Sequence, residues 1–78
     1  MTTRAQLQQT LATMPDVDDV TVVGEESLVA TVVSRSFRGQ NEAQRQETVW
    51  GYVRRQLGSS ALQTIEFIFT NTPEENAA

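Results

Sequence analysis

The chain has no cysteine and no histidine among its 78 residues, and all of its basic residues are arginine. Without cysteine it cannot form a disulfide or a thiolate metal site, and without histidine it lacks the usual zinc ligand and the usual proton-transfer group near neutral pH. It also has no Gly-rich phosphate loop and no nucleophile elbow. We therefore expect a protein that is not an enzyme, with no catalytic residue, no metal site and no cofactor.

Long hydrophobic runs are also missing. The apolar runs extend over only a few residues, whereas a membrane-spanning helix needs about 20. The first ten residues, MTTRAQLQQT, lack the apolar centre of a signal peptide. These features predict a cytoplasmic protein that does not associate with a membrane, and the length leaves room for one domain with one small core.

The charges are unevenly distributed along the chain. Residues 35–55 contain five arginines and two glutamates, a local net charge of +3, whereas the remaining residues contain one arginine and eight acidic side chains, a net charge of −7. A positive segment on an acidic chain favours a matched protein surface as the partner over general phosphate binding. The alternative is that these arginines form an ordinary solvated helix face.

Two helices are predicted from caps and apolar spacing. Thr3 and Gln6 form a capping box at the start of a predicted helix over residues 3–13, and Pro15 prevents the helix from continuing. Asn41 and Gln44 form a second capping pair before a long helix that ends near Gly58. Apolar residues follow a helical stripe along it, and we expect its tryptophan to pack in the core. The connecting turn before this helix should bury Phe37.

Three strands are predicted from alternating apolar residues. Residues 20–23 and 27–35 flank the turn Gly24-Glu25-Glu26 and read as a hairpin, and residues 65–70 read as a third strand. In the third strand, Ile65, Phe67 and Phe69 are expected to close the core. Val29 or Leu28 would then join Ile68 in an apolar patch on the uncovered face of the sheet, and such patches often mark interfaces.

The order of these elements predicts an α+β fold. An αββαβ sequence is best satisfied by a three-stranded sheet with two helices on one face. We expect one domain over residues 1–73 and a disordered acidic tail over residues 74–78, where no apolar residue larger than alanine occurs.

The segment from Phe37 to Leu57, FRGQNEAQRQETVWGYVRRQL, resembles the BolA family. The resemblance rests on Phe37 and Gly39, on Gln44-Arg45 and Val49-Trp50 in the long helix, and on a last strand that runs into Thr72-Pro73-Glu74. It implies the same αββαβ fold, which is related to the type II KH topology. BolA proteins are generally regarded as partners of monothiol glutaredoxins, to whose iron–sulfur cluster they supply a histidine.

The residues that carry function in the BolA family differ here. The family histidine in the long helix corresponds to Gln46, and the cluster-binding histidine corresponds to Gln63 by alternation or to Thr64 by counting back from Thr72. An amide or a hydroxyl is a poor ligand for a soft iron–sulfur centre. The resemblance therefore implies a divergent, non-enzymatic BolA-like adaptor or regulatory module that does not ligate a cluster.

We expect Arg35, Arg38, Arg45 and Gln63 to bind a protein partner, because the turn before the long helix lies near the partner surface in BolA-like proteins. A glutaredoxin-like protein or a larger assembly would fit that role. Two other functions stay open: a KH-like nucleic-acid-binding regulator, which the pI of about 4.5 and the absence of lysine disfavour, and a glutaredoxin partner in iron–sulfur handling. The sequence does not indicate whether the chain forms homo-oligomers.

Overall fold

The computed structural model describes residues 2–78. Its first helix, α1 (Arg4–Ala12), begins at the predicted capping box: the Thr3 hydroxyl accepts from the Gln6 backbone N–H and the Gln6 side chain accepts from the Thr3 N–H. The long helix α2 (Glu42–Leu57) begins at the same reciprocal pair between Asn41 and Gln44. Each pair satisfies two backbone donors that the first helical turn leaves without partners.

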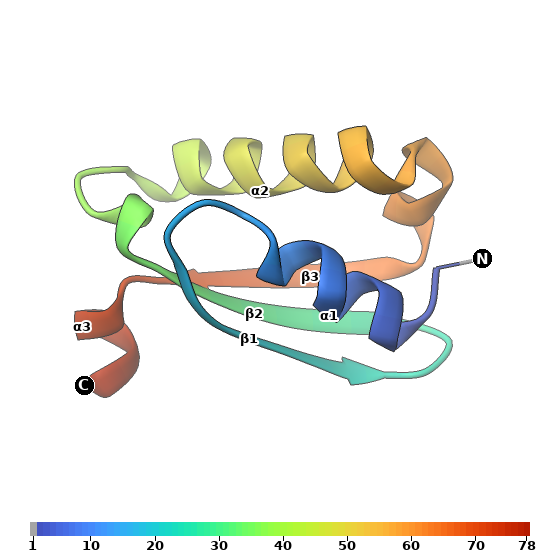
Figure 1. Ribbon diagram of the computed structural model, residues 1–78, viewed down its shortest axis with the longest axis horizontal. Coiled ribbons are helices and arrows are strands. Elements are labelled where there is room, and N and C mark those ends of the chain that lie inside the picture. Colours follow the sequence, from blue (N-terminus) through green and yellow to red (C-terminus); the bar gives the residue numbers. More distant parts are fainter. Residues whose placement is uncertain (1) are drawn as a thin grey trace.

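The sheet has three strands in the order β1-β2-β3. Strands β1 (Val17–Gly24) and β2 (Leu28–Ser34) form the expected antiparallel hairpin, and β3 (Ile65–Asn71) lies parallel to β2. A short helical turn, η1 (Arg35–Phe37), and then α2 connect β2 to β3, and a second short turn, η2 (Ser59–Gln63), precedes β3. Helices α1 and α2 cover the same face of the sheet (Figure 1), which confirms the predicted αββαβ α+β fold.

The core lies between the two helices and this face of the sheet. Phe37 is fully buried beneath the turn before α2, as expected, and Trp50 packs against the core but is only partly buried. The buried hydrophobic residues that form the core are Leu7, Leu11, Met14, Val20, Val22, Leu28, Ala30, Val32, Phe37, Val49, Val53, Ala61, Ile65 and Ile68. Within residues 2–78, no helix has the length and apolar character needed to cross a membrane.

The expected orientation of β3 is wrong after its first residue. Leu28 pairs with Ile65, but the next residue of β2, Val29, pairs with Phe67, so Glu66 is an extra residue in β3. A bulge of this kind reverses the side-chain alternation that follows it. Ile65 is therefore in the core as predicted, whereas Ile68 is buried and Phe67 and Phe69 lie on the opposite face.

The last residues form a helix where the sequence led us to expect a disordered tail. Helix α3 (Pro73–Ala77) begins at a third capping box, in which Thr72 and Glu75 satisfy each other's backbone N–H groups. Pro73 occupies the first helical position, where its missing N–H costs nothing. Figure 1 shows α3 at the end of the sheet, on the side opposite α2, and it contacts β2 and β3.

Candidate functional site

The face of the sheet that α1 and α2 leave uncovered is the main candidate for a functional surface, and we call it the open face. Side chains at paired positions of neighbouring strands point to the same side of a sheet. The register therefore gives the open face three rows, each with one residue from every strand: Val23, Val29 and Phe67; Thr21, Thr31 and Phe69; and Asp19, Val33 and Asn71.

Large apolar side chains are exposed on this face. Val23 is 54% exposed, Phe67 44% and Phe69 51%, and the two phenylalanine rings contact each other edge to face with their centroids 4.7 Å apart. Val33, by contrast, is only 4% exposed, and because α3 contacts β2 we infer that α3 covers this end. The uncovered part of the open face is therefore mainly apolar and aromatic, with Thr21 and Thr31 in its middle row.

The predicted apolar patch exists, but its members differ from those expected. Leu28 and Ile68 are fully buried in the core, whereas Val29 lies on the open face between Val23 and Phe67. The bulge at Glu66 causes this exchange, because it moves the aromatic residues of β3 from the core to the open face. The alternation of the sequence gave no sign of this extra residue, so Phe67 and Phe69 were missed as surface residues.

Arg35, the first of the predicted partner-binding arginines, is held by the loop before β1 and the start of that strand. Its guanidinium lies 3.2 Å from the Asp18 carboxylate and 3.8 Å from that of Asp16. Its backbone N–H also donates to the Asp16 carbonyl and to the Asp18 carboxylate. The side chain is 55% exposed, so it remains accessible, but its charge already has two acidic neighbours.

Arg38 and Arg45 each form a bidentate pair with a glutamate of α3. Arg38 donates through Nε and Nη2 to the Glu74 carboxylate at 2.8 and 2.5 Å, and Arg45 donates through Nη1 and Nη2 to the Glu75 carboxylate at 2.7 and 3.3 Å. Bidentate arginine–carboxylate pairs are the stronger and more directional kind of ion pair. These two pairs attach α3 to the turn before α2 and to the first turns of α2 itself.

Arg45 has further contacts that Arg38 lacks. Its side chain is only 12% exposed, and it also donates to the carbonyls of Gln40, at 3.0 Å, and Thr70, at 3.4 Å. The guanidinium carbon lies 5.9 Å from the centre of the buried Phe37 ring, within the range of a cation–π contact. Arg45 thus connects the turn before α2, the end of β3 and α3 within the chain. These internal contacts give no support to its predicted role in binding a partner.

Gln63 lies apart from the three arginines. It is the exposed last residue of η2 and precedes β3, whereas Arg45 contacts Thr70 near the end of that strand. At about 3.3 Å per residue these positions are roughly 20 Å apart along β3. Gln63 instead lies at the hairpin end of the sheet, where Leu28 donates its backbone N–H to the carbonyl of the next residue, Thr64. The four predicted site residues therefore do not form one surface.

The donor groups at this hairpin end do not fit an iron–sulfur cluster. The hairpin turn offers the carboxylates of Glu25 and Glu26, and the start of β3 offers the amide of Gln63 and the hydroxyl of Thr64. All are hard oxygen or amide donors, whereas iron–sulfur clusters take thiolate and, less often, imidazole ligands. Over residues 2–78, no three His, Cys, Asp or Glu side chains are grouped so that they could hold a metal ion.

Gln46, at the position where the sequence resemblance implies a histidine, connects α2 to β3. Its Nε2 donates to the carbonyl of Ile68 and to the Glu42 carboxylate, each at 2.8 Å, and its Oε1 accepts the indole N–H of Trp50 at 2.8 Å. Glu42 in turn accepts the hydroxyl of Thr70. All of these groups are bonded within the chain, so we interpret Gln46 as a structural residue.

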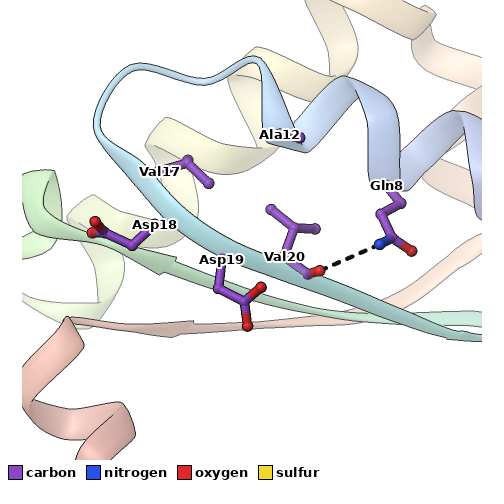
Figure 2. A pocket seen from close by; sticks show the side chains of 6 residues that line it. All are labelled: Gln8, Ala12, Val17, Asp18, Asp19 and Val20. Atoms are coloured by element: carbon purple, nitrogen blue, oxygen red, sulfur yellow. Dashed lines mark hydrogen bonds between the residues drawn. The ribbon is translucent and has the colours of Figure 1, made fainter.

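A hollow of about 300 Å³ lies between α1 and β1 (Figure 2). Its lining residues are Gln8, Ala12, Val17, Asp18, Asp19 and Val20. The Gln8 amide donates across it to the Val20 carbonyl at 3.5 Å. The hollow is open and has few convergent polar groups, which is unlike a small-molecule site.

Three solved structures share this arrangement over nearly their whole length. A BolA protein homologue from Coxiella burnetii superposes with a TM-score of 0.73 at 21% identity, with 100% of both chains covered. BolA1 from Arabidopsis thaliana gives 0.70 at 18% identity, with 96% of both chains covered. The BolA domain of SufE1 from Arabidopsis thaliana gives 0.71 at 18% identity, with 92% of this chain and 93% of that chain covered.

The chain has the BolA fold. The predicted resemblance is therefore confirmed by structure. The comparison by sequence gives a different result: no protein-family model matches the chain, and no curated protein matches it. At 18–21% identity these structures show the fold, so the functional argument depends on the surfaces described above.

The attachment of α3 should depend on pH. The hydrogen bond from Arg38 lowers the pKa of Glu74 below its ordinary value of 4.5, and the hydrogen bond from Arg45 lowers that of Glu75. A lowered pKa in the folded state means that the stabilisation is complete above about pH 4.5 and is lost as the pH falls through the lowered pKa. Amide chemical shifts of residues 73–77, followed by NMR during acid titration, should therefore move toward unfolded values below about pH 4.5.

The matched control for this titration is Glu75→Gln, which cannot ionise. In this variant α3 should already be less ordered at neutral pH, and its acid transition should be smaller. Amide shifts of α3 that stay constant in the wild-type chain down to about pH 2, while the core remains folded, would show that the two ion pairs do not hold the helix.

Proposed function

We propose that this chain is a non-enzymatic protein-interaction module, an adaptor or regulatory unit with the BolA fold, and that it does not ligate an iron–sulfur cluster. The observation that supports this most strongly is the open face, where Val23, Phe67 and Phe69 are about half exposed. Small soluble proteins rarely leave adjoining aromatic residues exposed unless the surface is used. The similar structure from SufE1 is described as a BolA domain, so the same fold also occurs as one domain of another protein.

The donor groups of the chain support the second half of the proposal. A shared cluster needs a nitrogen or sulfur ligand, and the positions that correspond to the family ligands hold Gln63 or Thr64. A glutaredoxin can still be the partner under this proposal. The visible spectrum of a cluster-loaded glutaredoxin should then stay unchanged when this chain is added.

Nucleic acid is disfavoured by the charges of the folded chain. Arg35, Arg38 and Arg45, which make up most of the basic segment, each lie within 4 Å of a carboxylate. A phosphate backbone would have to compete with these internal pairs while it approached an acidic molecule. A cytoplasmic location remains a prediction from the sequence.

The proposal predicts that partner capture depends on the open face. Tagged wild-type chain should retain a specific protein from native extract, and a Phe67→Ser, Phe69→Ser double variant should lose it, because aromatic residues dominate the affinity of most interfaces. Arg38→Ala is a control on the arginine segment and should retain the same protein. Thermal unfolding should show that the double variant is still folded, since both side chains are exposed.

Two outcomes would count against this proposal. If the wild-type chain enriches no protein over empty beads, the interaction role is not supported. If Arg38→Ala loses the captured protein and the double phenylalanine variant keeps it, the arginine segment is the binding surface, as the sequence suggested, and the open face is not.

A further inference from the structure

Four exposed acidic residues lie around the open face. Asp19 lies in the row at one end of the face, Glu25 and Glu26 lie on the hairpin turn at the other end, and Glu66 lies beside Phe67 at the bulge. Within residues 2–78, none of these four carboxylates forms an ion pair. We call these four residues the acidic rim. Figure 2 shows the Asp19 carboxylate on the other side of β1 from the core residue Val20.

Most of the remaining charges lie away from the acidic rim, although Arg4 lines a surface pocket together with Glu25. Arg35, Arg38 and Arg45 are paired with other carboxylates, as described above. The arginines of residues 2–78 that form no ion pair lie on the helices that cover the opposite face: Arg4 in α1, and Arg54 and Arg55 in the last turn of α2. Helix α2 also carries Glu42 and Glu47, which form no ion pair within residues 2–78. The unpaired charge around the apolar centre of the open face is thus mainly negative, whereas the helices that cover the opposite face carry both signs.

We propose that the open face binds a basic amphipathic helix of another protein, and this inference rests on the proposed interaction function. The apolar stripe of that helix would lie on Val23, Val29, Phe67 and Phe69, and lysine or arginine residues beside the stripe would lie over the acidic rim. Complementary charge of this kind speeds association and orients the partner, while the apolar contact supplies most of the affinity. The partner therefore has the opposite charge to the one that the arginine segment suggested.

The shape of the surface favours a helix over a strand. Three strands at a spacing of about 4.8 Å give a face about 10 Å wide, which is close to the diameter of a helix. Strand addition at the free edge of β3 would need backbone groups that are already bonded, because Gln46 donates to the Ile68 carbonyl and Arg45 donates to the Thr70 carbonyl. A partner is thus better accommodated on the face than at this edge.

Other occupants are less compatible with the acidic rim. In a twofold dimer through the open face, the rim of one copy would lie against the rim of the other, and both are negative. Nucleic acids and anionic membranes carry phosphate groups, which the same four carboxylates would repel. A basic protein segment is the partner whose charge and apolarity both match.

A pair of synthetic peptides tests this inference on the full chain. Each peptide is an amphipathic helix of about five turns with the same leucine stripe, and the flanks of the stripe are lysine in one peptide and glutamate in the other. Fluorescence anisotropy of labelled peptide should give a Kd at least roughly tenfold lower for the lysine peptide at about 0.15 M salt. Amide shifts on addition of that peptide should change at Val23, Val29, Phe67 and Phe69.

Single charge reversals provide the matched control. Glu66→Lys, beside the open face, should raise the Kd of the lysine peptide several-fold, whereas Glu47→Lys, which makes the same charge change on the exposed surface of α2, should leave it nearly unchanged. Phe69→Ser should weaken the binding of both peptides. Equal effects of the two charge reversals would mean that only net charge matters, and would overturn the inference.

Several other results would also overturn it. The two peptides could bind with equal affinity, or the amide shift changes could map to α1 or α2. The chain could also form a dimer in ultracentrifugation that Phe69→Ser abolishes, or bind duplex DNA or anionic vesicles through the open face. If the lysine peptide fails but extract still yields a protein whose capture needs Phe67 and Phe69, the interaction role stands and only the basic helix is rejected. If both experiments fail, the proposed function falls as well.

Discussion

Replacement of Phe37 by alanine should cost about 3 to 5 kcal/mol of the free energy of unfolding, the range found for large aromatic side chains removed from a core. Phe37 has no exposed surface and is the largest fully buried side chain of the chain's described residues. A 78-residue domain typically has a total stability of about 4 to 12 kcal/mol. The loss is therefore a large part of the total stability, and the variant should unfold at a clearly lower urea concentration than the wild-type chain when unfolding is followed by Trp50 fluorescence.

Phe67→Ala is the matched control for this experiment, because it removes the same side chain from a position that is 44% exposed. We expect it to cost less than about 1 kcal/mol, since the ring leaves no buried cavity behind. Similar losses in the two variants would contradict the assignment of Phe37 to the core and of Phe67 to the open face. The pair also separates stability from binding, because only Phe67 belongs to the proposed partner surface.

Helices α1 and α2 could be predicted because their sequence signals are local. A capping box needs only four consecutive residues, and both predicted boxes, at Thr3 and at Asn41, occur in the structure. The capping box at Thr72 has the same spacing and also has proline at the first helical position. Because no apolar stripe follows this box, the sequence predicts a disordered tail. In the structure, the cap and the ion pairs of Glu74 and Glu75 hold the helix in place of such a stripe.

The faces of β3 could not be predicted from its alternation. In the sequence, Ile65, Phe67 and Phe69 share one face of an alternating strand, and this alternation predicts that the two aromatic residues lie in the core. Glu66 is an extra residue only because of how β3 pairs with β2. This pairing depends on where α2 and η2 place the start of β3 relative to β2. A single inserted residue exchanges the two faces of everything that follows it.

The ion pairs of the predicted partner-binding arginines could not be predicted for a related reason. The positive charge of residues 35–55 was visible in the sequence, but the carboxylates that pair with Arg38 and Arg45 lie 36 and 30 residues later. Partners at such separations are brought together by the fold alone. The unpaired charge that remains near the open face is negative, so the sign of the expected partner changes from acidic to basic.

Arg45→Met should cost about 2 to 3 kcal/mol, because it keeps the aliphatic stem but removes a charged donor from a position that is only 12% exposed. The carbonyls of Gln40 and Thr70 lose a charge-assisted hydrogen bond, and Glu75 loses its partner. Urea unfolding gives the stability, and NMR should show that α3 becomes less ordered at neutral pH.

Arg38→Met is the matched control for this last variant. Arg38 forms the same kind of bidentate pair with a glutamate of α3, but its side chain is 54% exposed and donates to no carbonyl of the chain's described residues. Exposed ion pairs contribute little to stability, so Arg38→Met should leave the unfolding transition nearly unchanged. If Arg45→Met also leaves the unfolding transition unchanged, then Arg45 is not needed for the fold. That result would again favour the partner contact that the sequence predicts for Arg45. A clear loss for Arg45 alone would instead show that the arginine retained from the BolA-like pattern of this helix is kept for the fold.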